Sequence, residues 1–219
     1  MKNIGSTNFL KIGLSLVLIA AFNLSSKAQE KDFRLGLHFS PNFDWFKADV
    51  DGIENDGSVI NYSYGLITEF NFGSNNNYAV STGFSIFNQS GAIKGDDGSK
   101  LKQSLQYIEL PAVMKLKSNE IGYFTYFGKF GLSNKFNIAA ERELDGPTIE
   151  KNTETNKSDV IFYNASLVVG FGAEYNLSGN LSLLAGLDFH NGFINVYDKA
   201  SNIGDVKPFN ITLNLGVMF

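Results

Sequence analysis

Apolar and polar residues alternate along eight separate stretches of the chain. Successive side chains of a β-strand point to opposite faces of a sheet, so a period of two predicts a strand with one apolar face. The last stretch is apolar at every second position from Phe209 to Phe219. The apolar positions of the eight stretches span 33–45, 60–72, 78–86, 108–116, 124–132, 161–175, 181–189 and 209–219. We therefore expect an all-β fold with eight antiparallel strands.

The faces opposite these apolar faces are mostly small or polar, with few charged residues. In the last stretch they carry Asn210, Thr212, Asn214 and Gly216. A soluble sandwich or lipocalin would bury its apolar face and expose a charged one. A small membrane barrel does the reverse, because lipid surrounds it and small or polar side chains fill its interior. The pattern favours a transmembrane barrel, and a soluble all-β domain is the alternative.

The connections between the stretches alternate in length. Three are short and turn-like, at 73–77, 118–120 and 178–180, and four are longer, at 47–59, 88–103, 134–158 and 190–207. Short periplasmic turns and longer extracellular loops are typical of an up-and-down transmembrane β-barrel. Eight strands leave an interior that side chains can fill, so we do not expect an open diffusion pore.

The first 28 residues differ from the rest of the chain. Lys2 and Lys11 precede an apolar run at 12–22, and Ser26 and Ala28 supply small residues before Gln29. This order predicts a secretory signal peptide at 1–28. The alternative is a membrane anchor, but the run is too short to cross about 30 Å of hydrocarbon as a helix. We expect residues 29–219 to form one barrel domain in the cell outer membrane.

Charge and composition narrow the possible partners. The sequence has 18 basic and 22 acidic residues, and the segment 1–28 contains three of the lysines and no acid. Residues 29–219 therefore carry a net charge of 15 − 22 = −7, which argues against a nucleic-acid-binding surface. The chain has no cysteine, so no disulfide supports an exported fold. After residue 28 no apolar run approaches 18 residues, so we do not expect a helical membrane protein.

The alternation also places charged residues on the inward faces of the strands. They are Arg34, Glu69, Glu109, Lys115, Lys129, Glu174 and Asp188. Buried charges need partners, and we expect these residues to form a structural network that fills the barrel. A turn centred on Asn119 would place Glu109 directly opposite Lys129. The functional alternative is an ion or proton path, or a catalytic carboxylate.

Candidates for catalysis or metal binding are few. His38 and His190 both fall on inward faces, but no spacing suggests a nucleophile paired with a base. Two histidines without cysteine make a weak metal site. The acidic segment 49–57 departs from the calcium-binding EF-hand pattern at Ile53 and Glu54. We expect a solvated loop there, and no catalytic residue, cofactor or metal in the chain.

Three segments resemble the PorT-like family of outer-membrane barrels found in Bacteroidetes. The segment 107–115, YIELPAVMK, is similar to the fourth strand of that family, and 123–132 is similarly aromatic and rich in glycine. The terminal strand ends in Phe219, which looks like the signal read by the barrel-assembly machinery. The founding member is tied to type IX protein secretion. The resemblance thus implies a small outer-membrane barrel and adds an accessory role in secretion to the possible functions.

Three functions remain open from the sequence. The first is a structural or interaction barrel whose loops or periplasmic rim contact another envelope or secretion protein. The second is a narrow channel or transporter, and the third is a membrane-embedded enzyme. The partners that we expect are outer-membrane lipid, the barrel-assembly machinery during biogenesis and an envelope protein, with no nucleic acid.

Overall fold

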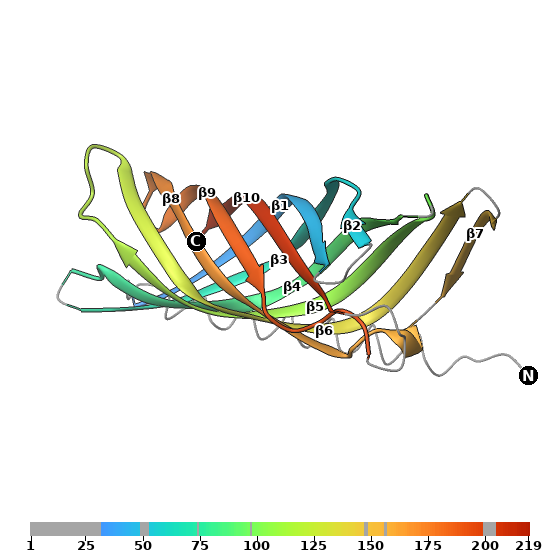
Figure 1. Cartoon of the computed structure of the whole chain (residues 1–219). Coiled ribbons are helices and arrows are strands. Elements are labelled where there is room, and N and C mark those ends of the chain that lie inside the picture. Colours follow the sequence, from blue (N-terminus) through green and yellow to red (C-terminus); the bar gives the residue numbers. More distant parts are fainter. Residues whose placement is uncertain are drawn as a thin grey trace, which may run out of the picture.

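A computed structural model gives the fold of this chain and describes residues 32–48, 53–73, 75–96, 98–146, 149–155, 157–198 and 205–219. Eight long strands form a closed antiparallel barrel (Figure 1), in the order β1–β3–β4–β5–β6–β8–β9–β10 and back to β1. Their bounds are β1 Phe33–Ala48, β3 Val59–Phe72, β4 Tyr78–Gly95, β5 Lys100–Lys117, β6 Phe124–Gly146, β8 Tyr163–Ser178, β9 Leu181–Gly192 and β10 Val206–Met218. The expected eight-stranded, all-β barrel is confirmed.

Three short elements complete the described fold. Strand β2 (Ile53–Asn55) pairs with β4, strand β7 (Ile149–Thr155) pairs with β6, and a 3₁₀ turn, η1, covers Lys157–Asp159. Among the described residues, no helix is long and apolar enough to cross a membrane. The expected signal peptide at 1–28 lies outside the described residues.

The strand registers set the width of the barrel. From Leu35 on β1, the directly paired residues of successive strands lead once around the barrel and back to β1 at Trp45. The register is therefore displaced by 45 − 35 = 10 residues over one circuit. With about 3.3 Å per residue and about 4.8 Å between strands, this stagger gives a tilt of about 40°. At that tilt an eight-stranded barrel is just wide enough for side chains to fill.

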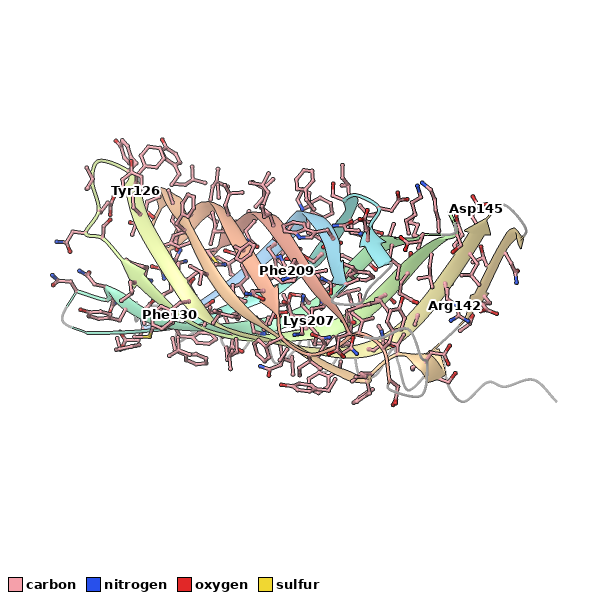
Figure 2. All side chains as sticks on the ribbon, in the orientation of Figure 1. Tyr126, Phe130, Arg142, Asp145, Lys207 and Phe209 are labelled. Atoms are coloured by element: carbon pink, nitrogen blue, oxygen red, sulfur yellow. The ribbon has the colours of Figure 1, made fainter. Side chains whose placement is uncertain are left out.

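The outer wall of the barrel is apolar. Each of the eight long strands carries large hydrophobic side chains that are more than a third exposed, including Tyr126 and Phe130 on β6 (Figure 2). A soluble monomer rarely exposes so large a continuous apolar area. Stacked aromatic pairs lie near both ends of the wall, with Trp45 against Phe209 and Phe72 against Tyr78. A lipid-facing band between two aromatic girdles has this arrangement.

The two ends of the barrel differ, and we call them the turn end and the loop end. At the turn end, β3–β4 and β8–β9 are joined by the predicted short connections, with Gly73 and Gly179 at positive φ. The predicted centre of the β5–β6 turn at Asn119 is wrong. The chain reverses at Gly122, which has a φ of 66° and lies between the bridged residues Ile121 and Phe124. Glycine adopts that conformation without steric cost, so the turn forms there.

Two of the four predicted long loops are mostly strand. Segment 88–103 continues β4 and β5, and segment 134–158 continues β6 and returns as β7. These strands extend past the ends of β9 and β10 at the loop end (Figure 1). Residues 49–52 and 199–204, within the other two long connections, lie outside the described residues.

The reason for this error is that the two faces exchange polarity at the loop end. On β5 the inward residues Leu105 and Tyr107 are buried and apolar, while outward Lys102 is exposed. Beyond the lipid-facing band the outer face meets water, so it no longer needs apolar side chains, and the inner face can form an ordinary core. Apolar alternation on the outer face therefore does not mark these strand segments.

Candidate functional site

The interior of the barrel holds three zones, stacked from the turn end to the loop end. The first is a cluster of charged side chains, which we call the ion cluster. It consists of Arg34 on β1, Glu69 on β3, Lys115 and Lys117 on β5, and Glu174 on β8. Because all five positions face inward, four strands bring these side chains together across the lumen.

Lys115 lies at the centre of the ion cluster. Its Nζ donates to Glu69 Oε1 and to Glu174 Oε1, both at 2.5 Å. Arg34 Nη1 donates to the other oxygen of Glu174 at 2.5 Å, and Arg34 Nη2 donates to Ser182 Oγ. The side chains of Lys115, Glu69 and Glu174 are at most 2% exposed. Charge pairs this deeply buried must largely satisfy one another, since bulk water hardly reaches them.

An aromatic ring supports this arrangement. Lys115 Nζ lies 4.1 Å from the centre of the Phe127 ring, within the range of a cation–π contact. The paired residues Gly172 and Gly186 leave room for that ring. A Cβ atom at Gly172 would lie 2.5 Å from the tip of Phe127, and one at Gly186 would lie 3.3 Å from it.

The second zone, near the middle of the barrel, contains further charges. Lys129 forms an ion pair with Asp188, with 2.7 Å between Nζ and Oδ2. Glu109 accepts a hydrogen bond from Ser133 and lies opposite Lys135. The predicted pairing of Glu109 with Lys129 is wrong, because the reversal at Gly122 moves the register by six residues along β6 and places Lys129 opposite Lys115.

A cavity of about 70 Å³ lies in the second zone, and its lining includes both histidines. His38 Nδ1 and Nε2 are within hydrogen-bond distance of Ser40 Oγ and Ser85 Oγ. His190 Nδ1 and Asp188 Oδ1 have no hydrogen-bond partner within the described protein. A polar cavity of this size can hold water molecules that bond to such atoms. No group of three or more potential metal ligands occurs among the described residues.

The third zone is an apolar core that fills the lumen at the loop end. Its buried strand residues are Phe46, Phe87, Ile93, Leu105, Tyr107, Ala140 and Val206. Val160 and the neighbours Val196 and Tyr197 pack onto this core from the connections between strands, and Val160 pairs with Tyr197. The described parts of these connecting segments therefore pack over the apolar core at the loop end.

A hydrogen bond fixes Tyr197 in this core. Its hydroxyl donates to Gln103 Oε1 at 3.3 Å. Burial raises the pKa of the Tyr197 phenol well above its usual range, so the hydroxyl keeps the proton that it donates.

Three interior charges were not singled out by the sequence analysis. Lys117 belongs to the ion cluster, and Lys135 Nζ lies 3.8 Å from the centre of the Phe87 ring. Asp44 accepts hydrogen bonds from Asn42 at 2.8 Å and Asn61 at 2.7 Å. Strand parity could have found Asp44 and Lys117. Lys135 lay within a segment predicted to be a loop.

Phe219 lies at the seam that closes the barrel. Its backbone N–H donates to Leu35 O at 2.7 Å, and its carbonyl accepts from the Leu35 N–H at 2.9 Å. The side chain is about half exposed on the outer wall. The acidic segment weighed as a calcium site lies partly outside the described residues, at 49–52.

Solved structures of small bacterial outer-membrane proteins resemble this fold. Ail of Yersinia pestis is 15% identical, with a TM-score of 0.44 over 86% of this chain and 99% of that chain. Neisserial surface protein A (NspA) is 13% identical, with a TM-score of 0.48 over 86% and 96% of the two chains. OprG from Pseudomonas aeruginosa is 13% identical, with a TM-score of 0.41 over 85% and 95%.

Comparison with curated proteins finds no match. A family model described as "Outer membrane protein beta-barrel domain" matches residues 26–198, well over half of the chain. This match agrees with the closed eight-stranded barrel and its apolar outer wall. The chain therefore belongs to the family of outer-membrane protein β-barrel domains.

Proposed function

We propose that this chain is a sealed outer-membrane barrel with a structural or interaction role. The observation that carries the proposal is the apolar core at the loop end, where Phe46, Phe87 and Tyr107 are at most 1% exposed. This core lies between the polar interior and the loop end, and Tyr197 packs over it. Ions would have to pass the closely packed rings of this zone and lose most of their hydration, which is costly.

The interaction surface of this proposal lies on the strands that extend past the barrel at the loop end. Arg142 and Asp145 on β6 are far from the lipid-facing residues Tyr126 and Phe130 (Figure 2). Arg142 forms ion pairs with Glu154 of β7 and with Asp159 of η1. In an outer-membrane barrel the longer connections face the outside of the cell, so this charged extension would be available to an external partner.

The proposal includes the route to the membrane. A signal peptide at 1–28 would direct export, and the barrel-assembly machinery would recognise the C-terminal strand that ends in Phe219. The apolar alternation of β10 and the backbone pairing of Phe219 with Leu35 support that role. A Phe219→Ala variant should then give less folded barrel in outer-membrane fractions, whereas Phe209→Ala in the same strand should be less affected.

An accessory role in protein secretion is the finer form of this proposal, and it rests on the PorT-like resemblance of segment 107–115. Crosslinking of intact envelopes followed by purification of this chain would identify its partner. A secretion component recovered with the wild type, and lost when β7 is deleted, would support that form.

Single-channel recording in planar bilayers tests the sealed barrel against a narrow channel. We expect the wild type to be silent. We expect a variant with Phe87→Ala and Tyr107→Ala to leak, because it removes two fully buried rings from the apolar core. Steady unitary currents from the wild type would contradict the proposal and favour the channel.

A further inference from the structure

A polar hollow of about 460 Å³ opens at the turn end of the barrel. The three short turns surround it, and the ion cluster supplies part of its floor through Arg34, Lys117 and Glu174. Side-chain amides make up much of the remaining lining, with those of Asn75, Asn76, Asn77 and Asn119 on two of the turns. A primary amide offers two donors and an acceptor oxygen, so this lining can bond to the donors and acceptors of a polar ligand.

The charges of the ion cluster do not balance. Arg34, Lys115 and Lys117 supply three positive charges, and Glu69 and Glu174 supply two negative ones. Both carboxylates are within 4 Å of at least two of these cations. Within this cluster one positive charge is left over, because Glu69 is shared by all three cations, and such a buried charge is incompletely compensated.

The surplus charge faces the hollow. Lys117 Nζ donates to the neutral Asn71 Oδ1 at 2.5 Å, and its nearest carboxylate oxygen, on Glu69, is 3.5 Å away. The side chain of Lys117 is only 7% exposed, although it lines the hollow. Glu120 is the remaining acidic residue in the lining, and it stands on an exposed turn where solvent screens its charge.

We propose that this hollow binds the carboxylate of a short peptide at Lys117 and Arg34, with the asparagine amides bonding to the peptide groups. The charge balance favours a carboxylate, because one negative charge neutralises the surplus. A phosphate group carries about −1.5 to −2 at neutral pH and would leave the site negative. Other proteins capture terminal carboxylates with converging hydrogen-bond donors.

The turn end faces the periplasm in an outer-membrane barrel, and two kinds of peptide carboxylate occur there. One is the D-alanine end of a cell-wall stem peptide, and the other is the C-terminus of a periplasmic protein. The same site chemistry serves both. This inference goes beyond the sealed barrel, because it concerns the opposite end and would hold whether or not the loop end conducts ions.

Isothermal titration calorimetry on the purified barrel in detergent micelles tests the site. The probes are N-acetyl-D-alanyl-D-alanine, its L,L form, the C-terminal amide of each, and inorganic phosphate. We expect at least one of the two acids to bind. The amide of that acid should have an affinity lower by roughly tenfold or more, as expected for loss of one charged hydrogen bond. Preference for the D,D acid would assign the cell wall as the source, and preference for the L,L acid would assign a protein terminus.

Variants separate the site from general effects on the barrel. Lys117→Met removes the surplus charge and should weaken binding of the acid about tenfold or more, while Lys117→Arg should retain most of it. Asn119→Ala removes one amide from an exposed turn without touching the ion cluster, so it keeps the test valid if Lys117→Met does not fold. Lys47→Met, at the exposed loop end of β1, is the matched control and should bind like the wild type.

The proposal fails if neither acid binds to the wild type. It also fails if acids and amides bind equally, or if phosphate binds more tightly than both acids. Equal affinity of the folded Lys117→Met variant and the wild type would overturn it as well. None of these results would bear on the conductance test of the sealed barrel.

Discussion

Lys115 is held by two carboxylates and is almost fully shielded from bulk water, with 2% of its side chain exposed. Its Nζ is 2.5 Å from an oxygen of Glu69 and 2.5 Å from an oxygen of Glu174. Such a cluster does not by itself imply high stability, since desolvation of each charge offsets much of the attraction. Removal of one partner is different, because the remaining charges stay buried without compensation.

We therefore expect Lys115→Ala to lower the free energy of unfolding by about 3–5 kcal/mol. Urea titration in detergent or lipid measures this loss. The folded fraction at each urea concentration is read from gel electrophoresis, in which the folded barrel and the heat-unfolded barrel give separate bands. Lys100→Ala is the matched control, because Lys100 is 52% exposed in its ion pair with Asp56. That substitution should cost about 1 kcal/mol or less. Similar losses for both variants would contradict the role of burial.

A substitution at Gly172 tests how closely the interior of the barrel is packed. A Cβ atom there would lie 2.3 Å from the backbone oxygen of Ala185 and 2.5 Å from Phe127, which supports Lys115. We expect Gly172→Ala to destabilise the barrel by about 1–3 kcal/mol through overpacking. Gly128→Ala, whose Cβ would meet no atom closer than 4.0 Å, should unfold at nearly the wild-type urea concentration. The prediction is wrong if the two variants unfold together.

The sequence could indicate which residues face inward but not which of them meet. Parity alone placed Glu69, Lys115 and Glu174 on inner faces, since the side-chain period of a strand is two. Their meeting across the lumen depends on the stagger of three strands that are not consecutive in the chain. That stagger follows from closure of the whole barrel, which no local pattern encodes.

At the scale of elements, the β5–β6 hairpin shows why register is difficult to predict. The polar residues at 118–120 looked like the turn, yet the reversal lies at Gly122, where the chain needs a positive φ. A shift of three residues in the turn centre moves each partner on β6 by six residues. Ala112 then lies opposite Leu132 rather than Tyr126.

Engineered cysteines can distinguish these two registers, because the chain contains none of its own. Ala112→Cys with Leu132→Cys joins directly opposite residues, whose Cβ atoms lie about 4.5–5.5 Å apart in an antiparallel pair. We expect this pair to oxidise readily to a disulfide. Ala112→Cys with Tyr126→Cys should not, because six residues of strand separate position 126 from 132, about 20 Å. The reverse result would support a β5–β6 turn centred on Asn119 and contradict the reversal at Gly122.

At the scale of the whole molecule, one barrel combines two kinds of β-structure. Within the lipid-facing band the outside is apolar and the interior is polar. At the loop end the interior becomes the apolar core of Phe46, Leu105 and Tyr107, and the outside becomes polar. The sequence indicated the first part, whose outer faces are apolar. It did not indicate the second, because the outer faces there are polar and lack the apolar alternation that marks the strands within the lipid-facing band.

Spin-label accessibility measures this exchange of faces most directly. Single cysteines would carry the label at outward positions Ile211, Leu213 and Leu215 of β10 and Lys102 and Ser104 of β5, with the barrel in lipid bilayers. We expect oxygen, which dissolves in lipid, to relax the three β10 labels, and a water-soluble nickel chelate to relax the two β5 labels. If the nickel chelate reaches the β10 labels as readily as those on β5, the apolar wall does not lie in lipid and the chain is not a transmembrane barrel.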